Sequence, residues 1–186
     1  MDWKADEPFK YLVISFVILL LFISWEIGKS IPRNFSWNLA WQTISGKVSA
    51  DCKIKNKYSD KIMDVSECST SDGASIIQWT DKNGDNQIWR LIQAKAGCFK
   101  IVNRYSGKVL DIMGGSAADG APVVQWTDNG GDSQLWQKIN AGSGYYKLKN
   151  KKSGKLLDVS NCSKDDGAGI IQWSDHSGDN QMWSFN

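Results

Sequence analysis

Two hydrophobic patterns divide this chain. From Tyr11 to Trp25 every residue is uncharged, and Ser15 and Ser24 are the only small polar residues in the run. Beyond about residue 47, apolar residues instead occur in short stretches such as 99–103 and 146–150, which are followed by turn sequences containing Ser-Gly. Short stretches between turns favour strands and leave no room for a long helix. The pattern predicts one apolar helix followed by an all-β domain.

The apolar run approaches the length of a membrane span. Extended past Glu26 to Ile27, it comes near the roughly 17-residue minimum for a transmembrane helix. A cleaved signal peptide is the alternative, but it needs a positive start and small residues at its end. Here acidic residues accompany the first lysines, and Trp25-Glu26-Ile27 follows the run. We expect a single transmembrane α-helix within residues 1–28, a linker at 29–46, and an undetermined orientation, because both flanks carry two basic residues.

The remainder of the chain repeats itself with a period of 47 residues. This register holds Asp64, Asp111 and Asp158, and it also holds Trp89, Trp136 and Trp183. A fixed period indicates a repeated structural unit. We expect three units of about four strands each, at about 47–94, 95–141 and 142–186. A propeller needs roughly four to eight blades, so three units must close in another way.

Three Gln-x-Trp motifs stand at the same place in each unit, at 87–89, 134–136 and 181–183. Together with the segments at 106–112 and 125–132, they make residues 47–186 resemble the ricin B-type lectins. The resemblance implies a β-trefoil that binds carbohydrate and has no enzymatic activity.

The resemblance also implies one sugar site in each unit. A carboxylate accepts bonds from neighbouring hydroxyls, amides complete the pattern, and a flat ring lies beneath the sugar. We expect the second site to be the weakest, because Ser133 stands where the others have asparagine. The implied carbohydrate-binding residues are Asp64, Trp79, Asn86 and Gln87 in the first unit, Asp111, Trp126 and Gln134 in the second, and Asp158, Trp173, Asn180 and Gln181 in the third.

Two questions about these residues stay open in the sequence. Isoleucine or valine stands where many family members have a polar residue, and a glutamine precedes each stacking tryptophan. Since strand side chains alternate, either the tryptophan faces sugar and the glutamine is buried, or the reverse. The aspartates could also tie their own turns. The resemblance places the late tryptophans, Trp89, Trp136 and Trp183, in the core, with Gln87, Gln134 and Gln181 bracing the loops.

Composition narrows the function further. With 22 basic and 20 acidic residues, the chain lacks the charge excess of a nucleic-acid-binding protein. One histidine, His176, stands in a variable loop position, and no metal-ligand spacing is present. Asp81, Asp128 and Asp175 are expected to be turn residues, because no calcium-loop spacing surrounds them. We expect no cofactor and no metal.

Four cysteines allow one short-range pairing. An antiparallel pairing of residues 57 and 62, across a turn near Ser59, would bring Cys52 beside residue 67. We therefore predict a Cys52–Cys68 disulfide if the domain lies in an oxidising compartment.

The expected protein is a membrane-tethered, non-catalytic lectin module. Its partners would be glycans, either galactose-type or other neutral sugars, and the lipid bilayer, with the trefoil on the periplasmic or extracellular side. The alternative is a structural subunit of a larger membrane complex, with other transmembrane subunits as partners and a trefoil that has lost or relaxed sugar binding.

Overall fold

The structure is a computed structural model that describes residues 49–95 and 97–186. Each repeat contributes four strands and two short 3-10 turns. The first repeat holds β1 (Ile54–Asn56), β2 (Ile62–Val65), η1 (Ser66–Cys68), β3 (Ile76–Trp79), η2 (Asp85–Gln87) and β4 (Trp89–Gln93). The second holds β5 (Phe99–Asn103), β6 (Val109–Ile112), η3 (Met113–Gly115), β7 (Val123–Trp126), η4 (Asp132–Gln134) and β8 (Trp136–Gly142). The third holds β9 (Tyr145–Asn150), β10 (Leu156–Val159), η5 (Ser160–Cys162), β11 (Ile170–Trp173), η6 (Asp179–Gln181) and β12 (Trp183–Phe185).

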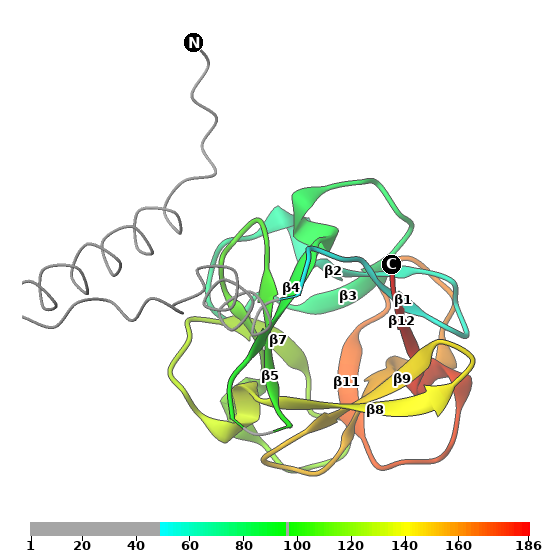
Figure 1. The fold of residues 1–186 in the computed structure, drawn as a ribbon. Coiled ribbons are helices and arrows are strands. Elements are labelled where there is room, and N and C mark those ends of the chain that lie inside the picture. The colour runs from blue at the N-terminus through cyan, green and yellow to red at the C-terminus, as the bar shows by residue number, and fades with distance from the viewer. Residues whose placement is uncertain (1–48, 96) are drawn as a thin grey trace, which may run out of the picture. The chain divides into compact units, whose positions relative to one another are not determined.

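The first and last strands of the three repeats form a closed barrel. Antiparallel pairing runs from β1 through β12, β9, β8 and β5 to β4. A bridge between Cys52 and Trp89 joins β4 back to the chain leading into β1. The last strand of the β domain therefore pairs with the first, and β12 lies next to β1 in Figure 1. Closure leaves the barrel without an unpaired edge strand.

The two middle strands of each repeat form a hairpin outside the barrel. These hairpins are β2–β3, β6–β7 and β10–β11. Single bridges connect Ser75 with Val124, Pro122 with Ile171, and Ile77 with a glycine of the third hairpin. Each hairpin therefore contacts both others. A six-stranded barrel with three hairpins is the β-trefoil that the sequence predicts.

Three tryptophans fill the barrel. Trp89, Trp136 and Trp183 are fully buried. Each indole Nε1 donates to a backbone oxygen of the second strand in its own repeat, at 2.9–3.1 Å. A buried indole needs such an acceptor, because an unpaired N–H in an apolar core is costly. The expected core role of these tryptophans is confirmed.

A buried glutamine fastens each repeat to another. Gln125 Nε2 donates to the backbone oxygens of Ser69, at 2.8 Å, and Ser71, at 3.0 Å, while its Oε1 accepts from Ser106. Gln78 and Gln172 make the matching bonds. The glutamine of the second repeat thus binds a loop of the first, the glutamine of the third binds a loop of the second, and the glutamine of the first binds a loop of the third. We call these three residues the glutamine clamps.

An ion pair accompanies every clamp. The Asp72 carboxylate accepts from Thr127 and pairs with Lys108 at 2.7 Å, both of them in the second repeat. Asp119 and Asp166 do the same toward the next repeats. The repeated Asp-Gly-Ala and lysine positions therefore serve the contact between repeats.

The cysteines correct the disulfide prediction. All four are free thiols, and the Cys52 thiol lies 3.4 Å from the backbone oxygen of Trp89. The actual register pairs Lys55 with Ile62, two residues away from the expected pairing. The chain before Lys55 then leaves β2 and pairs with β4 instead, so Cys52 lies at the barrel seam while Cys68 is exposed in η1. The Cys52–Cys68 disulfide is therefore wrong for this structure.

The predicted transmembrane helix and the linker lie outside the described residues. Among residues 49–95 and 97–186, no helix has the length and apolar character needed to cross a membrane.

The glutamine clamps can be tested by one substitution. Gln125→Met keeps the length of the side chain but leaves two buried backbone oxygens without a donor. We expect a loss of about 2–4 kcal/mol in the free energy of unfolding, measured by urea denaturation. The matched change Gln137→Met, at an exposed position of β8, should stay within about 0.5 kcal/mol of wild type. Equal effects of the two changes would contradict the clamp.

Candidate carbohydrate-binding hollows

The predicted site residues of each repeat come from three elements. Asp64 lies on β2, Trp79 ends β3, and Asn86 and Gln87 lie in η2. The register pairs Asp64 with Ile77 and Trp79 with Ile62. Directly opposed residues share a face of a sheet, as do residues two apart. The carboxylate and the ring therefore lie on one face of the hairpin, and the equivalent residues do so in the other repeats.

The tryptophans face outward and the neighbouring glutamines face inward. Gln78, Gln125 and Gln172 are fully buried, whereas Trp79, Trp126 and Trp173 are 36–41% exposed. The first of the two alternatives from the sequence therefore holds. Each ring is supported at one edge by a glycine of another hairpin: a Cβ on Gly73 would lie 3.4 Å from the Trp126 ring. Each ring is held in place while part of it stays exposed to solvent.

In the first repeat the carboxylate is partly engaged. Asn86 Nδ2 donates to Asp64 Oδ1 at 2.9 Å, and Asp64 is 7% exposed. Gln87 accepts from the backbone N–H of Lys82 and donates to the backbone oxygen of Thr80, so it braces the loop as expected.

In the third repeat the carboxylate is fully engaged. Asn180 donates to Asp158 Oδ1 at 2.9 Å, and Gln181 donates to Oδ2 at 2.8 Å. His176 Nε2 lies 3.1 Å from the same Oδ2. The imidazole thus occupies the place that a sugar hydroxyl would need, and a ligand would have to displace it.

In the second repeat one oxygen of the carboxylate has no hydrogen-bond partner. Gln134 donates to Asp111 Oδ2 at 2.9 Å. Ser133 is too short to replace asparagine, and Asp111 Oδ1 is the one buried side-chain polar atom without a partner in the described part of the chain. A hollow of about 590 Å³ lies against it, lined by Trp126, Asn129 and Ser133 among others. The site that we expected to be the weakest is therefore the one with a free acceptor.

Two features of the second hollow were not predicted from the sequence. Gly114 and Gly115 line it, where the other repeats have Glu67-Cys68 and Asn161-Cys162. Lys152, from the next repeat, also lines it. The signal was present as a double departure from the period: glycines at 114 and 115, and lysine where the first two repeats have tyrosine.

Burial changes the acidity of these carboxyl groups. Removal from water raises the pKa of Asp64 to about 6, and the nearby side-chain amides of Gln87 and Asn86 oppose this increase. The pKa of Asp158 is also raised by burial, and the bond with His176 opposes this. None of the three site aspartates accepts from a backbone N–H among the described residues, so the bonds seen do not tie their own turns. A buried carboxylate kept at an energetic cost is characteristic of a functional site.

The other repeated aspartates have structural roles. Asp81, Asp128 and Asp175 each accept from the backbone N–H two residues later, at 2.8–3.0 Å, which is an Asx turn. The prediction that they are turn residues is confirmed. Across residues 49–95 and 97–186, no group of three histidine, cysteine or acidic side chains is placed to hold a metal ion.

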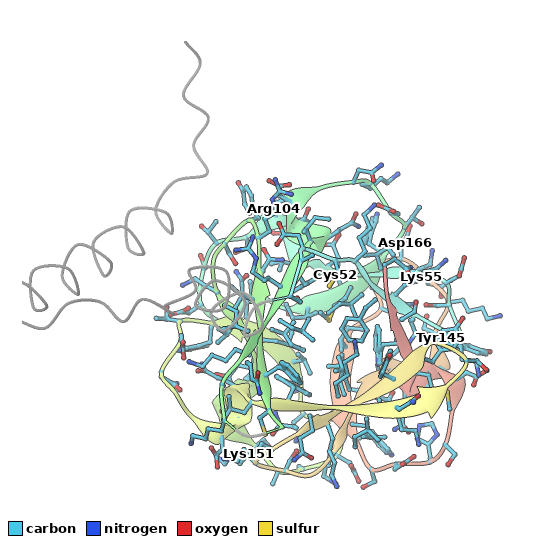
Figure 2. The ribbon with its side chains drawn as sticks, in the orientation of Figure 1. Cys52, Lys55, Arg104, Tyr145, Lys151 and Asp166 are labelled. Carbon is cyan, nitrogen blue, oxygen red and sulfur yellow. The ribbon has the colours of Figure 1, made fainter. Side chains whose placement is uncertain are left out.

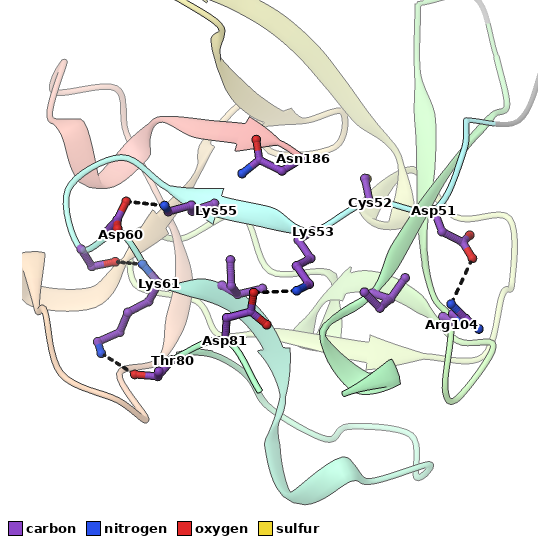
Figure 3. A pocket seen from close by; sticks show the side chains of 13 residues that line it. Asp51, Cys52, Lys53, Lys55, Asp60, Lys61, Thr80, Asp81, Arg104 and Asn186 are labelled. Carbon is purple, nitrogen blue, oxygen red and sulfur yellow. Dashed lines mark hydrogen bonds and ion pairs between the residues drawn. The ribbon is translucent and has the colours of Figure 1, made fainter. Parts of the chain in front are cut away.

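Another cavity, of about 890 Å³, lies elsewhere, mainly along the first repeat. Figure 3 shows its charged groups already paired, Lys53 with Asp81 and Lys55 with Asp60. A smaller hollow at the corresponding place in the third repeat contains the matching pair of Lys147 and Asp175. Because it recurs with the fold and its charges are satisfied, we do not assign it as the ligand site.

Comparison with known proteins agrees with this geometry. A designed threefold-symmetric protein, ThreeFoil, is 48% identical, with 73% of this chain and 96% of that chain covered and a TM-score of 0.72. An exo-β-1,3-galactanase from Clostridium thermocellum is 38% identical, with a TM-score of 0.72. The match covers 84% of this chain but only 31% of the galactanase chain.

The agglutinin of Rhizoctonia solani shares the fold at 21% identity, with 74% of this chain and 94% of that chain covered and a TM-score of 0.67. No curated protein matches the chain.

The fold, with a buried aspartate and an exposed tryptophan on the same hairpin face of every repeat, defines a lectin-like β-trefoil. Residues 34–126 and 132–186 match the family described as ricin-type beta-trefoil lectin domain-like, and the chain belongs to that family.

The raised pKa of Asp64 predicts a pH-dependent stability. Because this pKa is higher in the folded protein, at about 6, than its ordinary value of 3.8, the folded state binds more protons between these values. The stability contributed by Asp64 therefore falls as the pH rises through that window. Asp64→Asn removes the titration, so we expect the variant to gain about 1–2 kcal/mol relative to wild type between about pH 4.5 and 7.5.

Urea denaturation at the two pH values measures this gain. Asp60→Asn serves as the matched control, because the Asp60 side chain is 81% exposed. A constant difference between wild type and Asp64→Asn would contradict the burial of a charged carboxylate.

Proposed function

We propose that this protein binds glycans through the equivalent site in each of its three repeats without transforming them. The observation that carries the proposal is the recurrence, in every repeat, of a buried carboxylate on the same hairpin face as a half-exposed indole. A carboxylate that accepts hydroxyl bonds beside a flat apolar ring matches the two faces of a pyranose. Membership of the lectin-like family supports the same conclusion.

Charge in the second hollow favours binding over hydrolysis. Glycoside hydrolysis ordinarily uses two carboxyl groups, one of which is kept protonated by a raised pKa. Here the second carboxyl group is Asp132, and its hydrogen bond with Lys151, at 2.9 Å, lowers its pKa. Asp132 therefore stays ionised and is a poor proton donor.

Several shallow sites on one domain would act together. A single site of about millimolar affinity corresponds to roughly 4 kcal/mol. Two or three sites that engage one branched or repeating glycan raise the effective affinity through local concentration. Galactose-type and other neutral sugars are the first ligands to test.

The glycan proposal predicts a loss of binding when the flat rings are removed. The triple change Trp79→Leu, Trp126→Leu and Trp173→Leu keeps apolar contact with the supporting glycines. Each ring contributes on the order of 1 kcal/mol, so we expect binding on a glycan array to fall at least about tenfold. Tyr145→Leu removes an aromatic ring outside the hollows and should leave binding unchanged. Absence of any glycan binding by the wild-type chain would refute the function.

We also propose that the apolar segment at 11–27 tethers the trefoil to a membrane, with the trefoil on the periplasmic or extracellular side. The uncharged run and its flanks in the sequence support this proposal. A trefoil displayed outside the cell would meet glycans.

Protease treatment of intact cells tests the tether and its side. We expect the C-terminal domain to be digested while the cells stay sealed, with a protein known to be cytoplasmic as the protected control. Protection of the trefoil until the membrane is permeabilised would place it inside. Recovery of the chain in the soluble fraction after the membranes are washed with salt would refute the tether.

A further inference from the structure

The second hollow differs from the other two in a concerted way. At the positions of Cys68 and Cys162 it has Gly115, and at the positions of Tyr58 and Tyr105 it has Lys152. A Cβ placed on Gly115 would lie 2.5 Å from Lys152 Nζ. The ammonium group of Lys152 therefore occupies space that a cysteine side chain takes up in the other repeats. The glycine makes room for the lysine.

Glycine can stand at position 115 in place of cysteine without a change of backbone conformation, because φ is positive at this position in all three repeats. Gly114 and Gly115 both have φ of 60°, in the left-handed region. Cysteine holds the same conformation in the other two repeats, with φ of 50° and 49°. Since only glycine adopts it without steric cost, the change to glycine leaves the fold intact while it widens the hollow.

Lys152 is a free cation in the hollow. Within the described residues its ammonium group has no ion pair or hydrogen bond, and it does not pair with Asp111. The other charges nearby are matched: Asp132 pairs with Lys151 at 2.9 Å and with Lys95 at 3.4 Å. Among the residues that line the hollow, Lys152 is therefore the one cation, and it is not neutralised by an ion pair.

The hollow thus offers two different recognition groups. Asp111 lines the hollow and is 6% exposed, and its buried Oδ1 has no hydrogen-bond donor among the described residues. A ligand hydroxyl would bond to the Asp111 carboxylate where it faces the hollow, because a carboxylate can accept several hydrogen bonds. Lys152, on the other side, suits an anionic group, for which an ammonium group acts as a point charge.

We propose that the second hollow is specific for a hexose with an anionic substituent, a carboxylate or a sulfate ester. The Asp111 carboxylate accepts from a ring hydroxyl, the Trp126 ring lies against the sugar, and Lys152 pairs with the anionic group. This specificity rests on the glycan-binding function proposed above and gives the three repeats different ligands.

The hollow shares no lining residue with the cavity of about 890 Å³, so the two can be tested separately. In Figure 2, Lys151, which adjoins Lys152 and pairs with Asp132, lies at the bottom of the view, whereas Arg104 lies at the top and Lys55 at the right. Arg104 and Lys55 line that other cavity. A change at Lys55 therefore alters the net charge by the same amount without touching the second hollow.

Titration calorimetry of the full chain with matched methyl glycosides tests the proposal. The probes are the neutral galactoside and glucoside, the corresponding uronic acids, and the 6-sulfates. We expect one anionic form to bind about tenfold more tightly than its neutral parent. Lys152→Gln should abolish this preference and leave neutral binding unchanged, whereas Lys55→Gln should keep it. Comparison of the uronic acid with the sulfate identifies the anionic group.

Four results would overturn the proposal. The first is equal affinity for neutral and anionic forms, and the second is a preference that survives Lys152→Gln. The third is a preference lost instead in Lys82→Gln, which would place the anion at the first repeat. Acetate or sulfate ions that compete as well as the glycosides would also overturn it, because the sugar ring would then contribute nothing.

Failure of this inference differs from failure of the lectin function. If the neutral glycosides bind and lose affinity in the triple tryptophan variant, the lectin function stands even where the anionic preference is absent. If no glycoside binds the wild-type chain, both fail together.

Discussion

The trefoil depends on the buried bonds between its repeats. Each glutamine clamp joins a side chain of one hairpin to two backbone oxygens of a loop in another repeat. Because the three clamps form a cycle, no repeat can satisfy its loop alone. Such bonds are made in a low-dielectric interior, where an unpaired oxygen is costly. The same loops support the exposed tryptophans, so the clamps also determine where these rings lie.

The hollows carry an energetic cost that the clamps and core must offset. Asp64, Asp111 and Asp158 are nearly buried, and burial raises the pKa of Asp64 to about 6. An apolar side chain there would suit stability better. Charged acceptors held in place before a ligand arrives are instead useful for binding, because little reorganisation is then needed.

The three repeats share a backbone but differ in how the acceptor is used. Asn86 donates to one oxygen of Asp64. Both oxygens of Asp158 have partners, namely two amides and His176. In the second repeat Ser133 replaces the asparagine, and Asp111 Oδ1 has no hydrogen-bond partner. These differences arise in the loops around the strands, where substitution does not disturb the core. A single domain can therefore present three different arrangements around the same aspartate position.

The sequence by itself determined that the domain consists of three equal all-β units, because the period of 47 reflects burial that each repeat needs in the same place, and its resemblance to the lectin family implied the trefoil. It also grouped Asp64, Trp79 and Asn86, of which the structure bonds Asn86 to Asp64 and places Trp79 on the same hairpin face as Asp64. Tertiary structure decided the rest. The register that moved Cys52 to Trp89 depends on barrel closure. The open second hollow depends on Gly115 and Lys152, which belong to different repeats and meet only after folding. Contacts between distant segments are not encoded in local pattern or propensity.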